Sequence, residues 1–443
     1  MCSRTDTSRA ASELPALLDT LAARLAAEPD VRRWVIAYSG GLDSSLLLEL
    51  CSRLPLSQPL AAVHIDHQLQ AVSSTWAEHC QRQCERLAIP LTVLRVVPDS
   101  ASEAGARDAR YAAFERFLQP GDCLLLAQHA DDQAETLLLR LLRGAGVAGL
   151  AGMPVSRKLG QAKLLRPLLE EPRSRLEQVA AALKLSPVDD PTNAQDHYER
   201  NWLRLNILPL LKQRWPALLR RCRDTAALMA DADALLRERA AEDLAASRLG
   251  AGGVSIVAMR ALSPARQRNL MHHWLEQQTG QRLSRSRLNA LLHSMLSPRA
   301  DAEPIEQLQG QQLRRYRDGL YLLPNALPEV AGSGEPLRLQ VGQSHVLPHG
   351  ELTWYQADRG LPGGLILSLA YRHGGERLRP LGRGGSVSLK QLLQEAGVPP
   401  WLRPLQPILW SGDSIVAVPG ICLCEGQAVE NGWLPHWSGF GLS

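Results

Sequence analysis

The first third of the chain alternates short apolar runs with longer amphipathic runs. The apolar runs have the length of buried strands, and the amphipathic runs have the length and period of helices. We predict strands at residues 34–38, 60–64, 91–96 and 123–128, and helices from residue 43 and at 74–87, 103–118 and 131–143. Strands that alternate with helices indicate an α/β fold of the Rossmann-like kind, in which a parallel sheet carries helices on both faces.

The pattern changes in the second half of the chain. After a helix at 173–185, alanine and leucine recur at helical spacing over 215–249, 266–278 and 286–296, and residues 311–323 indicate a hairpin. Residues 324–335 mix Pro, Gly and Ser without periodicity. We therefore expect an α/β domain at 1–214, a mainly helical domain at 215–330, a linker region at 331–364 and an α+β domain at 365–443.

Composition restricts the class of protein. A chain of 443 residues is too long for one compact core. Its 45% hydrophobic and 21% charged residues describe a soluble protein, and its net charge of +4 permits a nucleic-acid partner without implying one. No stretch approaches the roughly 20 apolar residues of a membrane span, and the first residues lack the apolar run of a signal peptide. We expect a cytoplasmic protein with reduced cysteines.

The most informative stretch joins the first strand to the first helix of the sheet. Gly40 and Gly41 allow a ligand to approach the backbone closely, and Asp43 opens a helix whose unpaired N–H groups favour anions. The Gly-Lys-Ser/Thr of the common phosphate loop is missing. The order Ser39-Gly40-Gly41-Leu42-Asp43-Ser44 instead resembles the pyrophosphate loop of the ATP pyrophosphatases. The alternative is an ordinary core helix that follows a Gly-Gly turn.

A second polar segment follows the fourth strand. Asp131 and Asp132 stand where a helix begins, Glu135 shares a face with Asp132, and His129 precedes them. Ligands of parallel sheets bind beyond the carboxyl ends of the strands, so we expect this segment, the Gly-Gly turn and residues 64–67 to share one cleft. Alternatively, the aspartates are helix caps and the glutamate is a solvated side chain.

Two pairs of arginines and one histidine segment are further candidates. Arg107 and Arg110 lie three apart on one helix, and Arg200 and Arg204 lie four apart on another. Such pairs bind phosphates or carboxylates, or else belong to solvated helix faces. The His-Ile-Asp-His of residues 64–67 favours a loop that contacts a nucleotide over a metal site, because neighbouring residues of a strand point to opposite faces.

Taken in order, these motifs resemble the long bacterial form of the tRNA(Ile)-lysidine synthases, a family with the PP-loop ATP pyrophosphatase fold. The resemblance rests on the Gly-Gly loop, on residues 129–136 with 143–146, on 190–193 with 200–204, and on 377–403. Residues 67–70, His-Gln-Leu-Gln, depart from the family pattern, which usually has glycine after the histidine. That departure leaves the backbone beside the nucleotide open.

The resemblance implies that ATP adenylates O2 of the wobble cytidine, position 34, in the isoleucine tRNA with a CAU anticodon. Pyrophosphate leaves, and the ε-amine of free lysine then displaces AMP at C2. The residues implied for ATP are Ser39, Gly40, Gly41, Leu42, Asp43, Ser44 and Ser45. Those implied for catalysis are Asp43, His129, Asp132 and Glu135. Those implied for the tRNA or the adenylate are Arg107, Arg110, Arg143, Asn193, Arg200, Asn201 and Arg204.

The implied chemistry gives some of these residues roles. Asp43 would help to hold Mg²⁺ against the phosphates. Asp132 and Glu135 would attract the lysine ammonium, and either His129 or a carboxylate would take its proton. Cations of the last domain, Arg377, Arg379, Arg383, Lys390 and Arg403, would grip the body of the tRNA. The oligomeric state, monomer or homodimer, stays open.

Two rival functions remain in view. A tRNA thiolase of the same superfamily would usually carry Cys-x-x-Cys pairs, whereas this chain has Cys80-x-x-x-Cys84 and Cys422-x-Cys424. A non-catalytic tRNA-binding protein would not need the intact loop and the carboxylates of the second segment. Pyrophosphate release that requires both tRNA and lysine distinguishes all three functions.

Overall fold

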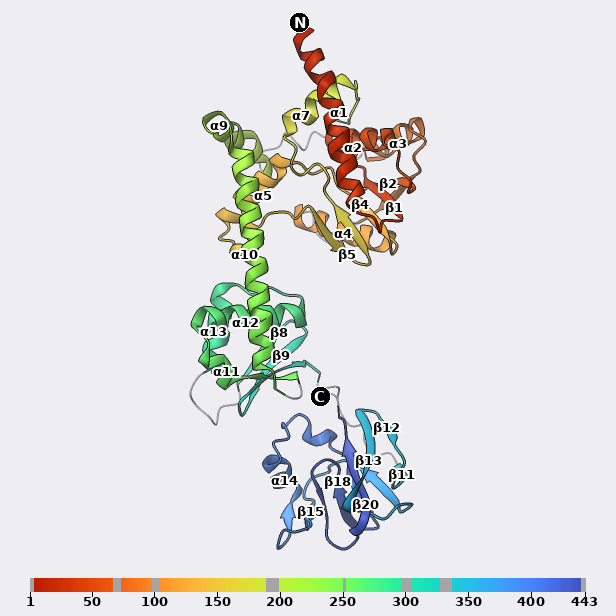
Figure 1. Ribbon diagram of the computed structural model, residues 1–443, viewed down its shortest axis with the longest axis vertical. Helices are drawn as coiled ribbons and strands as arrows, with labels where there is room; N and C mark the ends of the chain where they lie inside the picture. Colours follow the sequence, from red (N-terminus) through yellow and green to blue (C-terminus); the bar gives the residue numbers. More distant parts are fainter. Residues whose placement is uncertain are drawn as a thin grey trace. The chain divides into compact units, whose positions relative to one another are not determined.

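A computed structural model describes residues 4–66, 73–97, 103–188, 199–249, 252–296, 304–326 and 337–439 (Figure 1). It divides into two compact units, Met1–Leu235 and Leu236–Ser443. The long helix α10 (Leu218–Ser247) contains the boundary between them. Among the described helices, none combines the length and the apolar character that a membrane crossing requires.

A six-stranded sheet organises the first unit. Its strands are β1 (Arg33–Ala37), β2 (Leu60–Asp66), β3 (Leu91–Arg95), β4 (Asp122–Leu125), β5 (Ser156–Leu159) and β6 (Ala162–Leu165). Their order is β3-β2-β1-β4-β6-β5, with every pairing parallel except that of β5 with β6. The predicted parallel sheet is confirmed. Because the chain continues from β1 to one side and returns as β4 on the other, the switch point lies between β1 and β4, where sheets of this kind bind ligands.

Helices cover both faces of this sheet. The described helices of this unit that precede α10 are α1 (Arg4–Ala26), α2 (Leu42–Arg53), α3 (Ser73–Arg86), α4 (Glu103–Phe117), α5 (Ala130–Leu142), α6 (Val147–Leu150), α7 (Arg173–Ala182), α8 (Glu199–Trp202) and α9 (Leu208–Arg214), with a π-helical turn at Leu203–Ile207. Trp34 and Ile36 pack into the core that α1, α2 and α7 cover, whereas Val35 packs into the core of α4. This alternation along β1 is what a strand covered on both faces requires.

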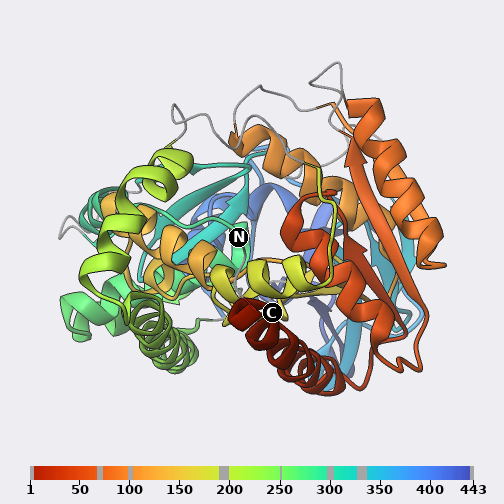
Figure 2. The ribbon, with the colours of Figure 1, turned by 90° about the horizontal axis from the view of Figure 1, so that it is seen from above.

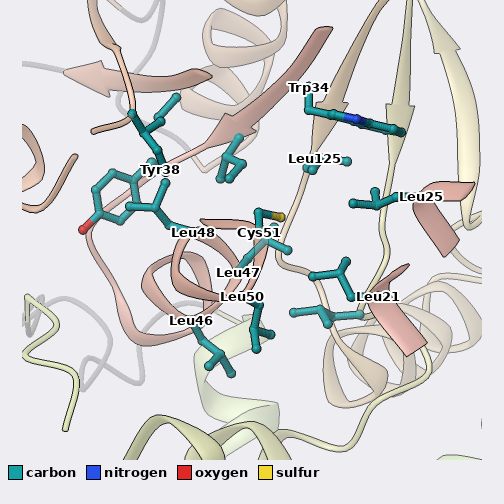
Figure 3. Close-up of a cluster of buried hydrophobic side chains, with 14 of the residues drawn as sticks. Leu21, Leu25, Trp34, Tyr38, Leu46, Leu47, Leu48, Leu50, Cys51 and Leu125 are labelled. Carbon is teal, nitrogen blue, oxygen red and sulfur yellow. The ribbon is translucent and has the colours of Figure 1, made fainter. Parts of the chain in front are cut away.

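The larger core lies against α2. Figure 3 shows Trp34 and Leu125 of the sheet gathered with leucines of α2 and with Leu21 and Leu25 of α1. Leu17, Leu21 and Leu25 recur every four residues, so α1 buries one face, although the sequence analysis did not predict this helix. Figure 2 shows α1 beside α7, and Arg175 of α7 pairs with Glu13 of α1 at 2.7 Å.

The second unit begins with a small helical part. It contains α11 (Ile256–Ala261), α12 (Pro264–Thr279) and α13 (Arg285–Leu296), which pack on a sheet of order β7-β10-β9-β8. The strands are β7 (Val254–Ser255), β8 (Ile305–Leu308), β9 (Gln311–Tyr316) and β10 (Gly319–Pro324). The predicted hairpin is β9–β10, and the two predicted helices of this part are α12 and α13.

The end of the chain is α+β. Its sheets have the orders β11-β14-β17-β18-β19, β12-β13-β20 and β15-β16, and α14 (Leu389–Glu395) is its α-helix among the described residues. The strands are β11 (Leu337–Gln340), β12 (His345–Leu347), β13 (Gly350–Gly360), β14 (Ile366–Ala370), β15 (Arg377–Leu378), β16 (Val387–Ser388), β17 (Ile408–Ser411), β18 (Ser414–Val418), β19 (Cys422–Leu423) and β20 (Val429–Trp437).

One expectation for this region needs correction. Residues 331–364 were expected to be a linker region, but residues 337–360 supply β11, β12 and β13. Along its length β13 pairs with β20, for example Leu352 with Trp437. Because β13 pairs with a strand that is distant in sequence, the local sequence does not reveal the pairing. The glycines and prolines that flank these strands also made the segment resemble a linker.

Candidate active site

The Gly-Gly turn leaves β1 at the switch point and enters α2. Gly40 has φ +85°, a conformation that favours glycine, and a Cβ there would lie 3.0 Å from Cys80 Sγ. The carbonyl of Gly40 accepts a hydrogen bond from Val188 N at 2.9 Å. Gly41 is the N-cap of α2 and has no side chain to occupy the helix end. The turn therefore presents backbone N–H groups at an open helix N-terminus, as binding of an anion requires.

Two serines hold this turn in shape. Ser44 Oγ accepts from Ser39 N at 3.2 Å and donates to Gly41 O at 3.1 Å, and it lies 3.0 Å from Ser39 Oγ. Ser45 Oγ donates to Gly40 O at 3.1 Å. These hydroxyl groups bond to other atoms of the loop itself. In this structure Ser44 and Ser45 therefore stabilise the conformation of the loop.

His64 supports the loop from the neighbouring strand. Its buried ring donates from Nδ1 to Tyr38 O at 2.8 Å, immediately before the loop. Residues 64–67 were expected to contact the nucleotide, but the ring of His64 faces the backbone of Tyr38, directly after β1. His67 and the unusual residues after it lie outside the described residues.

The second polar segment comes from β4, next to β1 in the sheet. His129 is the N-cap of α5, and its Nδ1 accepts from Asp132 N at 3.4 Å while Asp132 Oδ2 accepts from His129 N at 3.1 Å. Because Nδ1 accepts, the neutral ring carries its proton on Nε2. Nε2 lies 3.6 Å from Asp43 Oδ2 and 3.5 Å from Asp132 Oδ2. The structure thus brings the turn and the α5 segment together, as the sequence predicted.

Charge couples His129 to its neighbours. Burial lowers the pKa of the imidazole, but the nearby carboxylate of Asp43 and the charges of Asp132 and Asp131 outweigh it, so the pKa is raised. Burial likewise opposes ionisation of Asp43, but His129, Arg173 and Arg204 outweigh it and lower the pKa of the carboxyl. Asp43 is therefore an anion at neutral pH.

Glu135 and Asp132 hold two arginines. Arg204 donates from Nε to Glu135 Oε1 at 2.6 Å and from Nη2 to Asp132 Oδ1 at 2.9 Å. Arg200 donates from Nε to Glu135 Oε2 at 2.8 Å. Glu135 is fully buried, whereas the Arg200 and Arg204 side chains keep 19% and 27% of their surface exposed. The carboxylates that the sequence assigned to the lysine ammonium are thus engaged by the arginines that it assigned to phosphates.

Two residues beside this network, Arg173 and Lys212, were not predicted from the sequence, and both contact Asp131. Asp131 of α5 pairs with Lys212 of α9 and accepts from Arg173 N at 2.9 Å. Burial raises the pKa of this carboxyl, but Lys212, the Arg173 backbone and His129 outweigh it and lower the pKa. This arrangement ties α5, α7 and α9 together. A lone lysine and a lone arginine carry no recognisable motif, so only the fold could reveal them.

The other predicted residues lie in different surroundings. Arg143 forms an exposed ion pair with Glu199, and Arg107 lies on α4 with its guanidinium carbon 5.3 Å from the centre of the Tyr111 ring. Arg110 is an exposed residue of the same helix, and Asn201 lies in α8 beside Arg200. Asn193 lies outside the described residues.

Comparison with known proteins shows what this arrangement belongs to. Three family models match the chain: a PP-loop domain at residues 16–211, a TilS substrate binding domain at 255–321 and a TilS substrate C-terminal domain at 367–437. The tRNA(Ile)-lysidine synthase of Alkalilimnicola ehrlichii is 44% identical over 412 residues, which cover 90% of this chain and 92% of the relative. The chain belongs to the tRNA(Ile)-lysidine synthase family.

Other relatives agree across similar lengths. The tRNA(Ile)-lysidine synthase of Pseudomonas aeruginosa is 42% identical, with 91% of this chain and 93% of the relative aligned. That of Escherichia coli O157:H7 is 38% identical, with 90% and 95% aligned. The chain is thus an ATP-dependent ligase of the PP-loop class, and the comparisons favour neither the thiolase nor the non-catalytic alternative.

Proposed function

We propose that this chain ligates free lysine to C2 of the wobble cytidine in the isoleucine tRNA with a CAU anticodon. The proposal rests on the surroundings of Asp43 at the switch point of the sheet. Asp43 follows the Gly-Gly turn, and the N-terminus of α5 and Arg204 lie near its carboxylate. ATP, lysine and tRNA are substrates found together in the cytoplasm, where we place the reaction.

The turn is the site we assign to the ATP phosphates. Asp43 Oδ1 is buried and has no hydrogen-bond partner among the described residues, while Oδ2 faces His129. A carboxylate oxygen without a partner, beside an anion-binding turn, fits Mg²⁺, which is usually held by one or two carboxylates together with substrate phosphates. When bound, Mg²⁺ neutralises charge on the phosphates. Asp43 would hold it.

Arg200 and Arg204 are the residues we assign to the adenylate. Glu135 holds both through their Nε groups, so their remaining N–H donors have a fixed direction. Guanidinium groups arranged in advance stabilise negative charge as it develops on a phosphate. In this proposal Glu135 is a positioning residue and does not contact lysine.

Asp132 is the carboxylate we assign to the ε-ammonium of lysine. Asp132 and Asp43 both lie close to His129. Arg204 donates to Oδ1 of Asp132, but this side chain is still 14% exposed, whereas Glu135 is 1% exposed and both of its oxygens accept from arginine. The neutral ring of His129 already uses Nδ1 as an acceptor and carries its proton on Nε2, so it has no free lone pair. A carboxylate therefore takes the proton of lysine. A raised KM for lysine in an Asp132→Asn variant, without a matching rise for ATP, tests this assignment.

The reaction balances in two steps. Cytosine O2 attacks the α-phosphorus of ATP, a P–O bond forms, and pyrophosphate leaves from the turn. The deprotonated ε-nitrogen of lysine then attacks C2, and AMP departs with the former O2. The first step creates the leaving group that the second step needs.

Replacing Asp43 tests the assignment of the turn. The Asp43→Asn variant should lose tRNA-dependent pyrophosphate release while its Kd for tRNA stays within about twofold of the unmodified protein. Release is measured with and without tRNA and lysine, and Kd by filter binding. If the variant turns over normally at saturating ATP and Mg²⁺, Asp43 does not belong to the ATP site.

A further inference from the structure

A group of arginines stands at the far edge of the sheet, beside the site described above. Arg166 follows the carboxyl end of β6, Arg157 lies on β5, Arg140 on α5 and Arg107 on α4. We call these four residues the arginine cluster. Its centre is Tyr111 of α4, whose ring has the guanidinium carbon of Arg107 at 5.3 Å and that of Arg157 at 5.0 Å.

The inner members of the cluster are held by neutral oxygens. Arg166 is 3% exposed and donates to the Gln128 side chain and, at 2.8 Å, to Pro154 O. Arg140 donates from Nη1 to Gly149 O and Gly152 O, both at 2.8 Å. These carbonyls orient the guanidinium groups without neutralising them.

The cluster carries uncompensated charge. In the part of the chain that the structure describes, no carboxylate pairs with any of the four guanidinium groups, although most buried arginines in proteins are paired. Burial lowers the pKa of Arg166, and the charges of Arg157 and Arg107 lower it further while Tyr111 acts in the opposite direction. Burial and then the charge of Arg107 lower the pKa of Arg140. Like charges gathered in this way favour an anion between them.

The position of the cluster indicates which anion. In the sheet, β6 and β5 lie two and three places from β1, roughly 10–15 Å from the Gly-Gly turn at a strand spacing of about 4.8 Å. Gln128, which binds Arg166, directly precedes His129 of the site. An RNA that inserts one base at this site brings the phosphates of the flanking nucleotides beside it.

We propose that the arginine cluster binds a backbone phosphodiester of the RNA close to the reacting nucleotide. This inference rests on the proposed function, because it takes the RNA as the substrate of the site. Arginine forks recognise phosphate oxygens, and the exposed members, Arg107 and Arg157, form the entrance while Arg166 and Arg140 supply charge from behind. The cluster positions the RNA and takes no part in the bond changes.

The test compares Arg157→Gln with a control on the same surface. Arg157 is exposed and pairs with no carboxylate of the described residues, so its loss should leave folding intact. Arg116→Gln removes an equal charge from the exposed end of α4, about 13 Å from Arg107 along the helix. Both full-length variants are titrated with unmodified tRNA(Ile) transcript and with its isolated anticodon stem-loop, at several salt concentrations, and KM for ATP is measured alongside.

Arg157→Gln should raise the Kd for both RNAs about tenfold and leave KM for ATP unchanged. The salt slope, which is the slope of log binding constant against log salt concentration, should become shallower by about 0.7. Arg116→Gln should change neither. Unchanged affinity and slope in a folded Arg157→Gln variant overturn the inference, and so does a raised KM for ATP with unaltered RNA binding, which would assign the cluster to the nucleotide. Lysidine formation by the unmodified protein is scored separately, so failure of the cluster and failure of the proposed function are distinguishable.

Discussion

At the scale of single residues, Glu135 is the most constrained group of the candidate site. Both of its oxygens accept hydrogen bonds from arginine, and the side chain is buried. A buried ion pair gains little over a well-packed apolar pair, but removing one partner leaves the other charge buried and unpaired. The structure therefore makes Glu135 necessary for the placement of Arg200 and Arg204.

A matched pair of variants tests this role. Glu135→Gln should lower the free energy of unfolding by about 3–5 kcal/mol, because Arg200 and Arg204 lose the buried carboxylate that accepts from both of their Nε groups. Glu199→Gln removes the partner of Arg143 in a pair that is 71% and 67% exposed and should change stability by less than about 1 kcal/mol. Urea unfolding measures both. Equal losses in the two variants would mean that Glu135 does not anchor the arginines.

His129 makes stability depend on pH. Its pKa is raised in the folded protein, so its contribution is fully present below the ordinary value of 6.5 and is lost as the pH rises through the raised pKa. The gap in unfolding free energy between the unmodified protein and His129→Gln should therefore shrink from about pH 5 to about pH 8. Denaturant titrations along this range measure the gap. A gap that is constant, or that widens toward high pH, contradicts the pairing with Asp43.

At the scale of elements, the site is made by the turn between β1 and α2 and by the N-terminus of α5. The sequence predicted both, because Gly-Gly after an apolar run and Asp-Asp at a helix start are local signals. It could not show that Glu135 holds Arg200 and Arg204, since that contact joins residues 65 and 69 positions apart. The sequence showed the spacing of the two arginines, but their partners depend on how α5 packs against α8 and the π-helical turn that follows it.

The two glycines of the turn should differ in their response to alanine. Gly40 has positive φ and a Cβ would crowd Cys80 Sγ at 3.0 Å, so Gly40→Ala should destabilise the protein by about 1–3 kcal/mol. Gly41 has φ −71° and a Cβ would meet Ser39 Oγ at 3.6 Å, so Gly41→Ala should cost less, at most about 1 kcal/mol from the poorer N-cap. Thermal unfolding compares the two. The account of the turn fails if Gly41→Ala is the more damaging to stability.

At the scale of the whole molecule, the candidate catalytic residues that the structure describes lie in the first unit, and the second unit carries cations. Of the five C-terminal cations predicted to grip tRNA, Arg383 pairs with Glu395, while Arg379 and Lys390 make no side-chain pair within the described ranges. Apart from the linker region, the expected domain boundaries stay predictions. The strands at 337–360 escaped prediction because β13 pairs with a strand near the end of the chain.

Variants of these cations test whether the second unit contributes affinity for tRNA and not catalysis. Replacing Arg379 and Lys390 together with glutamine should raise the Kd for tRNA and make its salt slope shallower by about 1.4–1.8, with kcat at saturating tRNA preserved. Arg383→Gln, whose charge is already paired, should alter the slope less. Filter binding across a salt series gives the slopes. A loss of kcat without any change in slope would place these cations in catalysis instead.

Mass spectrometry of the RNA product distinguishes lysidine formation from both rival functions. Unmodified tRNA(Ile) transcript with a CAU anticodon is incubated with the full-length protein, ATP, Mg²⁺ and isotopically labelled lysine, then digested to nucleosides. We expect one cytidine per tRNA, at position 34, to be heavier by the labelled lysine less one water, and no such product when ATP or lysine is left out. A cytidine that gains sulfur, or a tRNA that binds tightly and returns unmodified, would contradict it.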